Sequence, residues 1–334
     1  MRRIGNLYYQ IPMYGNLCLA FWKAARGKQT RREVIEFRNH FQTNISDLQK
    51  QLLHHKPDIG HYRFFQVYDP KHRSICAALF PERVLHHAIM NICEPVLESY
   101  AIHDSYACRK EKGNRKAILR SQQFARKNKW YLKLDIRKYF DSIDHKIMIQ
   151  QLSRRFKDHD LLYLFQQILE TYHTNPGKGM PIGNLISQHL ANFYLASFDH
   201  RIKDELGIKA YLRYMDDFIL FSNDREYLKI RLEEIREFLL QELALELKDN
   251  IQLNRCTKGF PFLGYRIFPR TIRLTPGSRK RFVKKFRKYE EMWQKGRWTE
   301  DDMVRHMEAL VEFTRFADAR AFRLNVIQRF GVSF

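Results

Sequence analysis

The spacing of apolar positions changes several times along the chain. From Arg31 to Leu53 apolar residues recur about every 3.6 positions, which predicts a helix. Two short β-rich runs on either side of Asp69-Pro70 predict a hairpin. Further helical patterns cover 81–100, 117–127, 143–171, 185–206, 225–243 and the chain from 276 onward. Strand patterns lie at 130–136, 210–222, 245–254 and 260–268. Helices that collect against an antiparallel sheet give the α+β class, which we predict.

The excess of basic over acidic residues indicates an anionic partner. The 334 residues contain 59 Lys and Arg against 37 Asp and Glu, a net charge of +22. Solubility alone needs a net charge of only about 2–8, so the excess favours a polyanion such as nucleic acid. The hydrophobic fraction of 44% supplies enough material for a core, which excludes a mostly disordered chain.

The sequence offers no membrane or metal-thiolate signal. No uncharged segment is apolar enough to span a bilayer, and the N-terminus lacks the apolar run of a secretory signal. The five cysteines lie far apart, without zinc-ligand or redox spacing. We therefore expect reduced thiols, a cytoplasmic location and no membrane partner.

Two sets of acidic residues stand in apolar surroundings. Asp216 and Asp217 are neighbours within the apolar hairpin 211–221, where they would repel each other and lose hydration. A bound divalent cation would offset both effects, and a plain turn is the alternative. Asp135 ends an alternating strand and faces away from its apolar side, with a strand-end cap as the alternative. Two strands ending in acids can converge on two Mg²⁺ ions about 3.5–4 Å apart, as phosphoryl transfer requires.

These acids also carry a family resemblance. Tyr214-Met215-Asp216-Asp217, preceded about eighty residues earlier by Asp135 and its Asp-x-x-x-x-Phe strand end, resembles motifs C and A of reverse transcriptases. Segments at 68–89, 179–195 and 259–267 resemble the finger segment, motif B and the strands behind the primer terminus. The resemblance covers roughly 60–275. It implies a right-hand polymerase fold and an RNA-directed DNA polymerase. Such an enzyme uses dNTPs, template RNA, RNA–DNA duplex and two Mg²⁺ ions, for which Mn²⁺ can substitute.

The same resemblance implies a division of the chain. An N-terminal helical extension would occupy 1–60, and fingers would occupy 61–129 with part of 145–178. The palm would comprise 130–144 and 179–272, and a basic helical thumb 273–334.

A narrower resemblance concerns the subfamily. SYACRKEKGNRKA (105–117) and PIGNLISQ (181–188) are similar to reverse transcriptases of diversity-generating retroelements, which copy a template RNA with frequent errors at adenine. That subfamily implies a basic accessory protein oligomer as a partner. Group II intron and retron enzymes usually carry Ala where this chain has Met215, and they and antiphage-defence enzymes are the alternatives. A non-catalytic RNA-binding scaffold is the alternative from another class, but it would not need all three acids.

The resemblance assigns residues to the reaction centre. Asp135, Asp216 and Asp217 match the metal-binding carboxylates, with Asp217 as a supporting charge, and the backbone carbonyl of Ile136 would complete one metal site. Lys248 is a candidate for the acid that protonates pyrophosphate, although a surface lysine is the simpler interpretation.

Other residues match the family's nucleotide pocket. Lys71 and Arg73 match finger cations that neutralise the triphosphate, with solvated hairpin charges as the alternative. Phe140 matches the aromatic residue that collides with a 2′-hydroxyl, with a core role as the alternative because either Phe140 or its neighbour Tyr139 must face inward.

The motif B segment adds three positions. Gly183 would let the backbone approach the template base, and Gln188 faces the same region. Ile182 stands where higher-fidelity relatives carry Gln, so that a hydrogen-bonding group is missing there.

Two basic clusters are candidates for binding the nucleic-acid backbone, by phosphates rather than sequence. The first lies in a loop, with a solvated loop as its alternative, and consists of Arg109, Lys110, Lys112, Arg115 and Lys116. The second lies in RKRFVKKFRK (279–288) and comprises Arg279, Lys280, Lys284, Lys285 and Arg287. Phe282 and Phe286 begin an apolar helix stripe there, which we expect to pack into a core.

Overall fold

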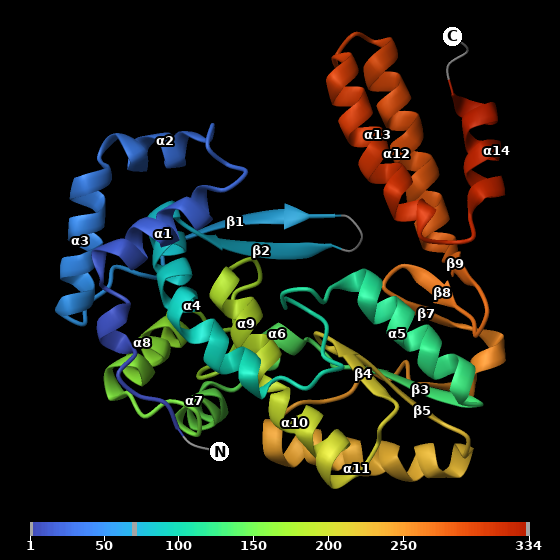
Figure 1. Ribbon diagram of the computed structural model, residues 1–334, viewed down its shortest axis with the longest axis horizontal. Helices are drawn as coiled ribbons and strands as arrows, with labels where there is room; N and C mark the ends of the chain where they lie inside the picture. Colours follow the sequence, from blue (N-terminus) through green and yellow to red (C-terminus); the bar gives the residue numbers. More distant parts are fainter. Residues whose placement is uncertain (1–2, 69–71, 332–334) are drawn as a thin grey trace.

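A block of helices forms the N-terminal part of the molecule (Figure 1). The computed structural model describes residues 3–68 and 72–331. A short turn, η1 (Tyr8–Gln10), leads into α1 (Tyr14–Ala25), α2 (Arg32–Asn39) and α3 (Phe41–Leu53). The single helix predicted from Arg31 to Leu53 is wrong in one respect, because the chain leaves helical geometry at His40 (φ −115°, ψ 36°). The amide of Asn44 donates across this break to the Phe37 carbonyl at 2.9 Å.

The predicted hairpin projects from this block toward the C-terminal helices (Figure 1). It pairs β1 (Tyr62–Val67) with β2 (Arg73–Ala78), and its tip lies outside the described residues. The helices that follow it in the same part of the molecule are α4 (Phe80–Tyr100), α6 (Tyr139–Ser142), α7 (His145–Ser153) and α8 (His159–Glu170).

A four-stranded antiparallel sheet lies at the centre, in the order β4-β5-β3-β6. Its strands are β3 (Trp130–Asp135), β4 (Tyr211–Tyr214), β5 (Asp217–Ser222) and β6 (Gln252–Arg255). Because side chains alternate along a strand, both faces supply apolar residues. Leu132 and Leu134 face the main core, whereas Tyr131 on the same strand joins a second core.

Helices cover the main-core face of this sheet, and a mixed layer covers the other face. The helical side has α9 (Leu185–Tyr194), α10 (Ala196–His200), η2 (Arg201–Glu205) and α11 (Arg225–Leu243). The second side has α5 (Asn114–Lys127), η3 (Cys256–Lys258) and a small sheet of β7 (Phe260–Phe262), β8 (Tyr265–Ile267) and β9 (Ile272–Leu274). The predicted α+β class is confirmed.

Three helices end the chain and stand beyond the small sheet (Figure 1). They are α12 (Pro276–Gln294), α13 (Glu300–Arg315) and α14 (Arg320–Phe330). Phe282 and Phe286 of α12 are buried with Val326 of α14 in a small core of their own, as the apolar stripe predicted. None of the helices in residues 3–68 and 72–331 has the length and apolar character needed to cross a bilayer.

Candidate active site

The sheet brings the three predicted acids to one edge. Asp135, at the end of β3, lies opposite Asp217, the first residue of β5. Asp216 belongs to the two-residue turn between β4 and β5. Its neighbour in the turn, Met215, has a φ of +56°, a conformation that costs a non-glycine residue about 1–3 kcal/mol. A strained, short turn thus presents Asp216 next to the ends of two buried strands.

Two lysines contact these carboxylates. The Lys133 ammonium lies 2.6 Å from Asp217 Oδ1 across the β3–β5 pair. The Lys248 ammonium lies 2.7 Å from Asp135 Oδ1, and the Lys248 backbone N–H donates to the Asp135 carbonyl at 2.8 Å. Lys248 is therefore not the plain surface lysine that the sequence favoured. Sequence reasoning missed Lys133, although its position two residues before Asp135 places both on one strand face.

The carboxylates at this edge lie close enough together to raise one another's pKa values. Burial raises the pKa of the Asp216 carboxyl, and the charge of Asp135 raises it further. Burial also raises the pKa of the Asp217 carboxyl to about 6, against the opposing effect of the Lys133 ammonium. Both shifts mean that the folded chain resists full ionisation of this edge.

The donor set fits hard divalent cations. Among the described residues no group of three or more His, Cys, Asp or Glu side chains is arranged to hold a metal ion, and two of the three carboxylates contact lysines instead. The side chains at the edge nevertheless offer oxygen donors, which Mg²⁺ prefers. A cation would relieve the repulsion that raises the pKa of Asp216. Ile136, whose carbonyl is the predicted further ligand, also lies at this edge, since its backbone N–H donates to the Asp216 carbonyl at 3.4 Å.

Of the two neighbours, Tyr139 faces the core and Phe140 is the more exposed. Tyr139 is the buried one, and its hydroxyl donates to the Ala191 carbonyl. Phe140 is half-buried and packs on the edge of the main core. Its carbonyl accepts a hydrogen bond from the Met180 N–H at 2.8 Å, which ties it to the start of the motif B segment.

The motif B segment packs against the hairpin. The Cys76 N–H of β2 donates to the Ile182 carbonyl at 2.8 Å. Gly183 has a φ of +125°, and a Cβ there would lie 2.7 Å from Ile75 Cγ2. Only glycine therefore fits this approach. Gln188, one turn into α9, accepts a weak hydrogen bond from the Cys108 thiol at 3.6 Å.

Of the two predicted finger cations, only Arg73 lies within the described residues. Arg73 is exposed on β2, on the same strand face as Ile75, which contacts the Gly183 position. Lys71 lies outside the described residues.

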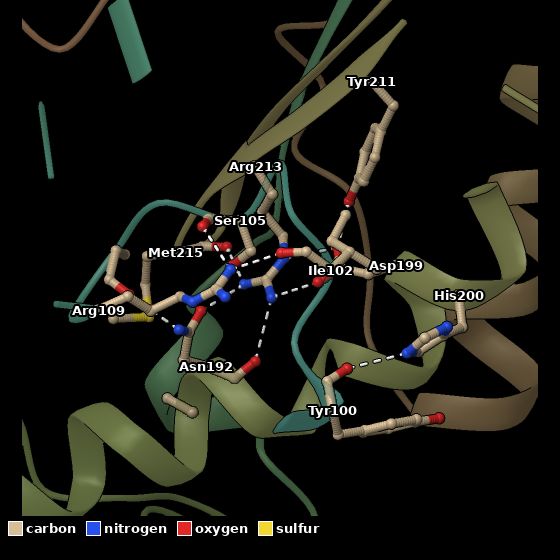
Figure 2. A network of polar contacts seen from close by, with 12 residues as sticks. Tyr100, Ile102, Ser105, Arg109, Asn192, Asp199, His200, Tyr211, Arg213 and Met215 are labelled. Carbon is tan, nitrogen blue, oxygen red and sulfur yellow. Dashed lines mark hydrogen bonds and ion pairs between the residues drawn. The ribbon is translucent and has the colours of Figure 1, made fainter. Parts of the chain in front are cut away.

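One member of the loop cluster has a structural role, which corrects its assignment. The Arg109 side chain is 8% exposed and forms an ion pair with Glu98 at 2.7 Å. Its guanidinium also donates to the carbonyls of Ile102 and Ser105, at 2.5 and 2.8 Å (Figure 2). These partners engage the guanidinium within the protein, so the structure favours a packing role for Arg109 over the predicted contact with phosphate.

The remaining loop cations are closer to the surface. Lys110, Lys116 and Arg115 are exposed, and the Arg115 guanidinium lies over the Phe316 ring at 5.1 Å. Lys112 donates to the His103 carbonyl at 2.8 Å, so it too is partly engaged within the loop.

The α12 helix buries Phe282 and Phe286 and exposes several cations. An open groove of about 800 Å³ follows this helix and is lined by Arg279, Lys280, Val283, Lys284, Arg287, Lys288 and Glu291. Arg279 and Arg287 also lie over the rings of Phe322 and Phe330 of α14 at 5.4 and 5.3 Å.

Comparison with known proteins places this site in a family. The family described as "Reverse transcriptase (RNA-dependent DNA polymerase)" matches residues 55–267, which include all three acids. The chain belongs to the reverse transcriptase family. The predicted enzyme class, RNA-directed DNA polymerase, is confirmed at the level of that family.

Individual relatives of this reverse transcriptase are distant. It is 26% identical to Protein YkfC of Escherichia coli (strain K12) over 266 residues, 64% of this chain and 70% of that protein. It is 22% identical to the Group II intron-encoded protein LtrA of Lactococcus lactis subsp. cremoris over 189 residues, 54% of this chain and 31% of LtrA.

The solved structures give the fold. Apo telomerase from Candida tropicalis superposes with a TM-score of 0.50 at 11% identity, over 72% of this chain and 54% of that one. At this identity the likeness concerns the fold alone. The right-hand polymerase fold expected from the sequence is confirmed.

Proposed function

We propose that this reverse transcriptase copies a template RNA into DNA by two-metal-ion nucleotidyl transfer. The observation that carries the proposal is the meeting of Asp135, Asp216 and Asp217 at one sheet edge, beside Lys133 and Lys248. Bound Mg²⁺ ions would supply Lewis-acid activation of the primer hydroxyl and charge stabilisation at the triphosphate. Asp135 and Asp216 would hold them, with Asp217 as a supporting charge and the Ile136 carbonyl as a further oxygen ligand.

The chain's own groups then bind and orient the nucleotide. Arg73 would pair with phosphate oxygens of the dNTP, and the same role is proposed for Lys71, which lies outside the described residues. Phe140 would lie under the sugar and exclude a 2′-hydroxyl. Lys248, whose ammonium contacts Asp135, would deliver a proton to the leaving pyrophosphate.

Nucleic acid would lie along two cationic surfaces. The groove on α12 supplies Lys280 and Lys284 for the phosphates of an RNA–DNA duplex. Lys110, in the loop before α5, and Lys116, in the first turn of α5, would supply the second surface.

For the biological role we propose error-prone cDNA synthesis in a diversity-generating retroelement. The supporting observations are the segments 105–117 and 181–188 and the apolar Ile182 at the half-buried start of motif B. A basic accessory protein oligomer would be a partner in that role. The chain spans 70% of YkfC and 31% of LtrA, so the activity of the whole protein is part of the proposal.

A second candidate is a reverse transcriptase of the group II intron type. The likeness to LtrA over 54% of this chain favours it. Met215 counts against it, because intron enzymes usually carry Ala at that position. The two candidates differ in the expected error spectrum of the cDNA.

The test is sequencing of cDNA made on one mixed-sequence RNA by the native chain and by Ile182→Gln, at matched extension. We expect errors concentrated at template adenine, and a several-fold fall in Ile182→Gln, because one hydrogen bond contributes about 1 kcal/mol. Ile182→Leu, which adds no hydrogen bond, is the matched control and should keep the native spectrum. Even, low error rates at all four bases would favour the intron-type candidate, and absence of cDNA would remove the polymerase proposal.

A further inference from the structure

A buried arginine lies directly behind the acidic turn. Arg213 is on β4, two residues before Met215, and its side chain is 1% exposed. Figure 2 shows its guanidinium enclosed by Asp199 of α10, Asn192 of α9 and the backbone of Met215. A charged residue inside the apolar strand that leads to the acids is unexpected, and sequence reasoning did not single it out.

Every N–H group of this guanidinium has an acceptor. Nε and Nη2 donate to the two carboxylate oxygens of Asp199 at 2.8 and 2.5 Å. Nη1 donates to Asn192 Oδ1 at 2.9 Å and to the Met215 carbonyl at 3.0 Å. The second Nη2 hydrogen goes to the Asn192 carbonyl at 3.1 Å. All five donors are used, an arrangement that the three donors of a lysine cannot reproduce.

The bonds fall into two groups with different consequences. Among the described residues, Asp199 is the carboxylate that pairs with Arg213, and it also accepts a hydrogen bond from the Tyr211 hydroxyl at 2.6 Å. The bonds to Met215 and Asn192 do not balance charge. They join the strained residue of the acidic turn to the helix that follows the motif B loop, and the Asn192 amide continues the link to the Ala107 carbonyl at 2.9 Å.

We propose that Arg213 is a positioning residue of the reverse transcriptase, which fixes the acidic turn against α9 so that Asp216 is held for metal binding and nucleotide addition. The inference rests on the proposed function. It predicts that loosening the turn impairs the ion site and the addition step, while duplex and dNTP binding stay close to native.

The test compares Arg213→Lys with Tyr211→Phe. Arg213→Lys keeps a charge beside Asp199 but loses the fork that reaches Met215 and Asn192. Tyr211→Phe removes a buried hydrogen bond to the same Asp199 without touching the turn, so it controls for general loss of stability. The readouts are the Mn²⁺ dissociation constant of the protein, by electron paramagnetic resonance, the rate of single-dNTP addition on an RNA template, the dNTP KM and the melting temperature.

We expect Arg213→Lys to weaken Mn²⁺ binding several-fold and to lower the addition rate about tenfold or more, with dNTP KM within about twofold of native. Tyr211→Phe should lower the melting temperature but keep native Mn²⁺ affinity and rate. Equal Mn²⁺ affinity and rate in both variants would overturn the inference.

A second variant covers the case in which Arg213→Lys does not fold. Asn192→Ala removes one acceptor of the guanidinium and leaves the Asp199 pair intact, so it should show the same pattern at smaller size. Native values for a folded Asn192→Ala would also overturn the inference. A native chain that binds Mn²⁺ but makes no DNA would instead refute the proposed function, because the Mn²⁺ comparison stands without catalysis.

Discussion

At the scale of single residues, the site consists of carboxylates that are buried close to one another, which makes their ionised forms less stable. Asp216 and Asp217 have raised pKa values, and the turn that carries Asp216 contains Met215 in a left-handed conformation. Such strain persists only where surrounding structure enforces it. Lys133 and Lys248 offset part of the charge from neighbouring strands, and Arg213 holds the turn from behind.

Sequence alone could predict the acids but not their partners. Asp135, Asp216 and Asp217 are recognisable in the sequence because carboxylates in apolar strands repel one another and lose hydration, which a bound cation would offset. In the sequence Lys133 and Arg213 resemble ordinary surface cations. The strand register brings Lys133 to Asp217, and the packing of α10 against β4 brings Asp199 to Arg213. The ion pair between Arg109 and Glu98 could not be foreseen for the same reason, since Glu98 belongs to another element.

Phe140 gives a prediction about sugar selection. Phe140→Ala should raise the ratio of ribonucleotide to deoxynucleotide incorporation at least about tenfold, because it removes the group that would collide with a 2′-hydroxyl. The neighbouring Tyr139→Phe, which loses only a buried hydroxyl, is the control and should keep the native ratio. The measurement is single-nucleotide addition with each triphosphate. An unchanged ratio in Phe140→Ala would mean that its ring serves packing alone.

His87 gives a prediction about pH. Burial, reinforced by the nearby charge of Lys23, lowers the pKa of the His87 ring to about 4. The unfolded chain, with a pKa of about 6.5, therefore takes up the proton first, so stability is complete above that value and falls as pH drops toward 4. At pH 5 the loss is about 2 kcal/mol.

The measurement is the melting temperature between pH 7 and pH 5. His87→Gln should lose less stability over this interval than the native chain. His54→Gln, at an exposed position, should follow the native curve. A His87→Gln curve parallel to the native one would refute the assignment.

At the scale of elements, capping residues determine the ends of some helices, and contacts with other elements accompany the breaks in others. The helix predicted at 225–243 is α11 with the same limits, because Asp224 caps its start and Ala244, with a φ of +52°, ends it. The helix predicted at 185–206 is instead divided into α9, α10 and η2. The sequence there has no Gly or Pro to mark a break, and the side chains of Asn192 and Asp199 are both held by Arg213 of β4.

The α12 element carries a prediction about salt. Lys280→Gln/Lys284→Gln should lower the slope of log affinity against log salt for an RNA–DNA duplex by about 1–2, because each phosphate contact contributes about 0.7–0.9. Lys280 and Lys284 line the groove, whereas Arg279 and Arg287 are partly engaged with α14. Lys229→Gln/Arg236→Gln on α11 is the control with the same change in charge. Equal slopes for the two double variants would place the duplex away from α12.

At the scale of the whole molecule, the β1–β2 hairpin and the C-terminal helices lie on the same side of the central sheet, with the hairpin pointing toward the helices (Figure 1). The chain has a net charge of +22, whereas the candidate site contains carboxylates that repel one another. That contrast suits a protein that attracts nucleic acid broadly and binds cations at one point. The order of motifs along the chain allowed the α+β class and the polymerase fold to be predicted, but not how the C-terminal helices pack.

The most direct measurement of the central claim is the rate of single-dNTP addition to a primer on an RNA template, for the native chain, Asp216→Asn and Asp249→Asn. Asp249 carries an exposed side chain paired with Arg137 at 2.7 Å, so its variant changes the same charge outside the acidic turn. We predict a fall of about a thousandfold or more in Asp216→Asn and a native rate in Asp249→Asn. An active native chain whose Asp216→Asn variant extends the primer at the native rate would contradict the assignment of this edge as the active site.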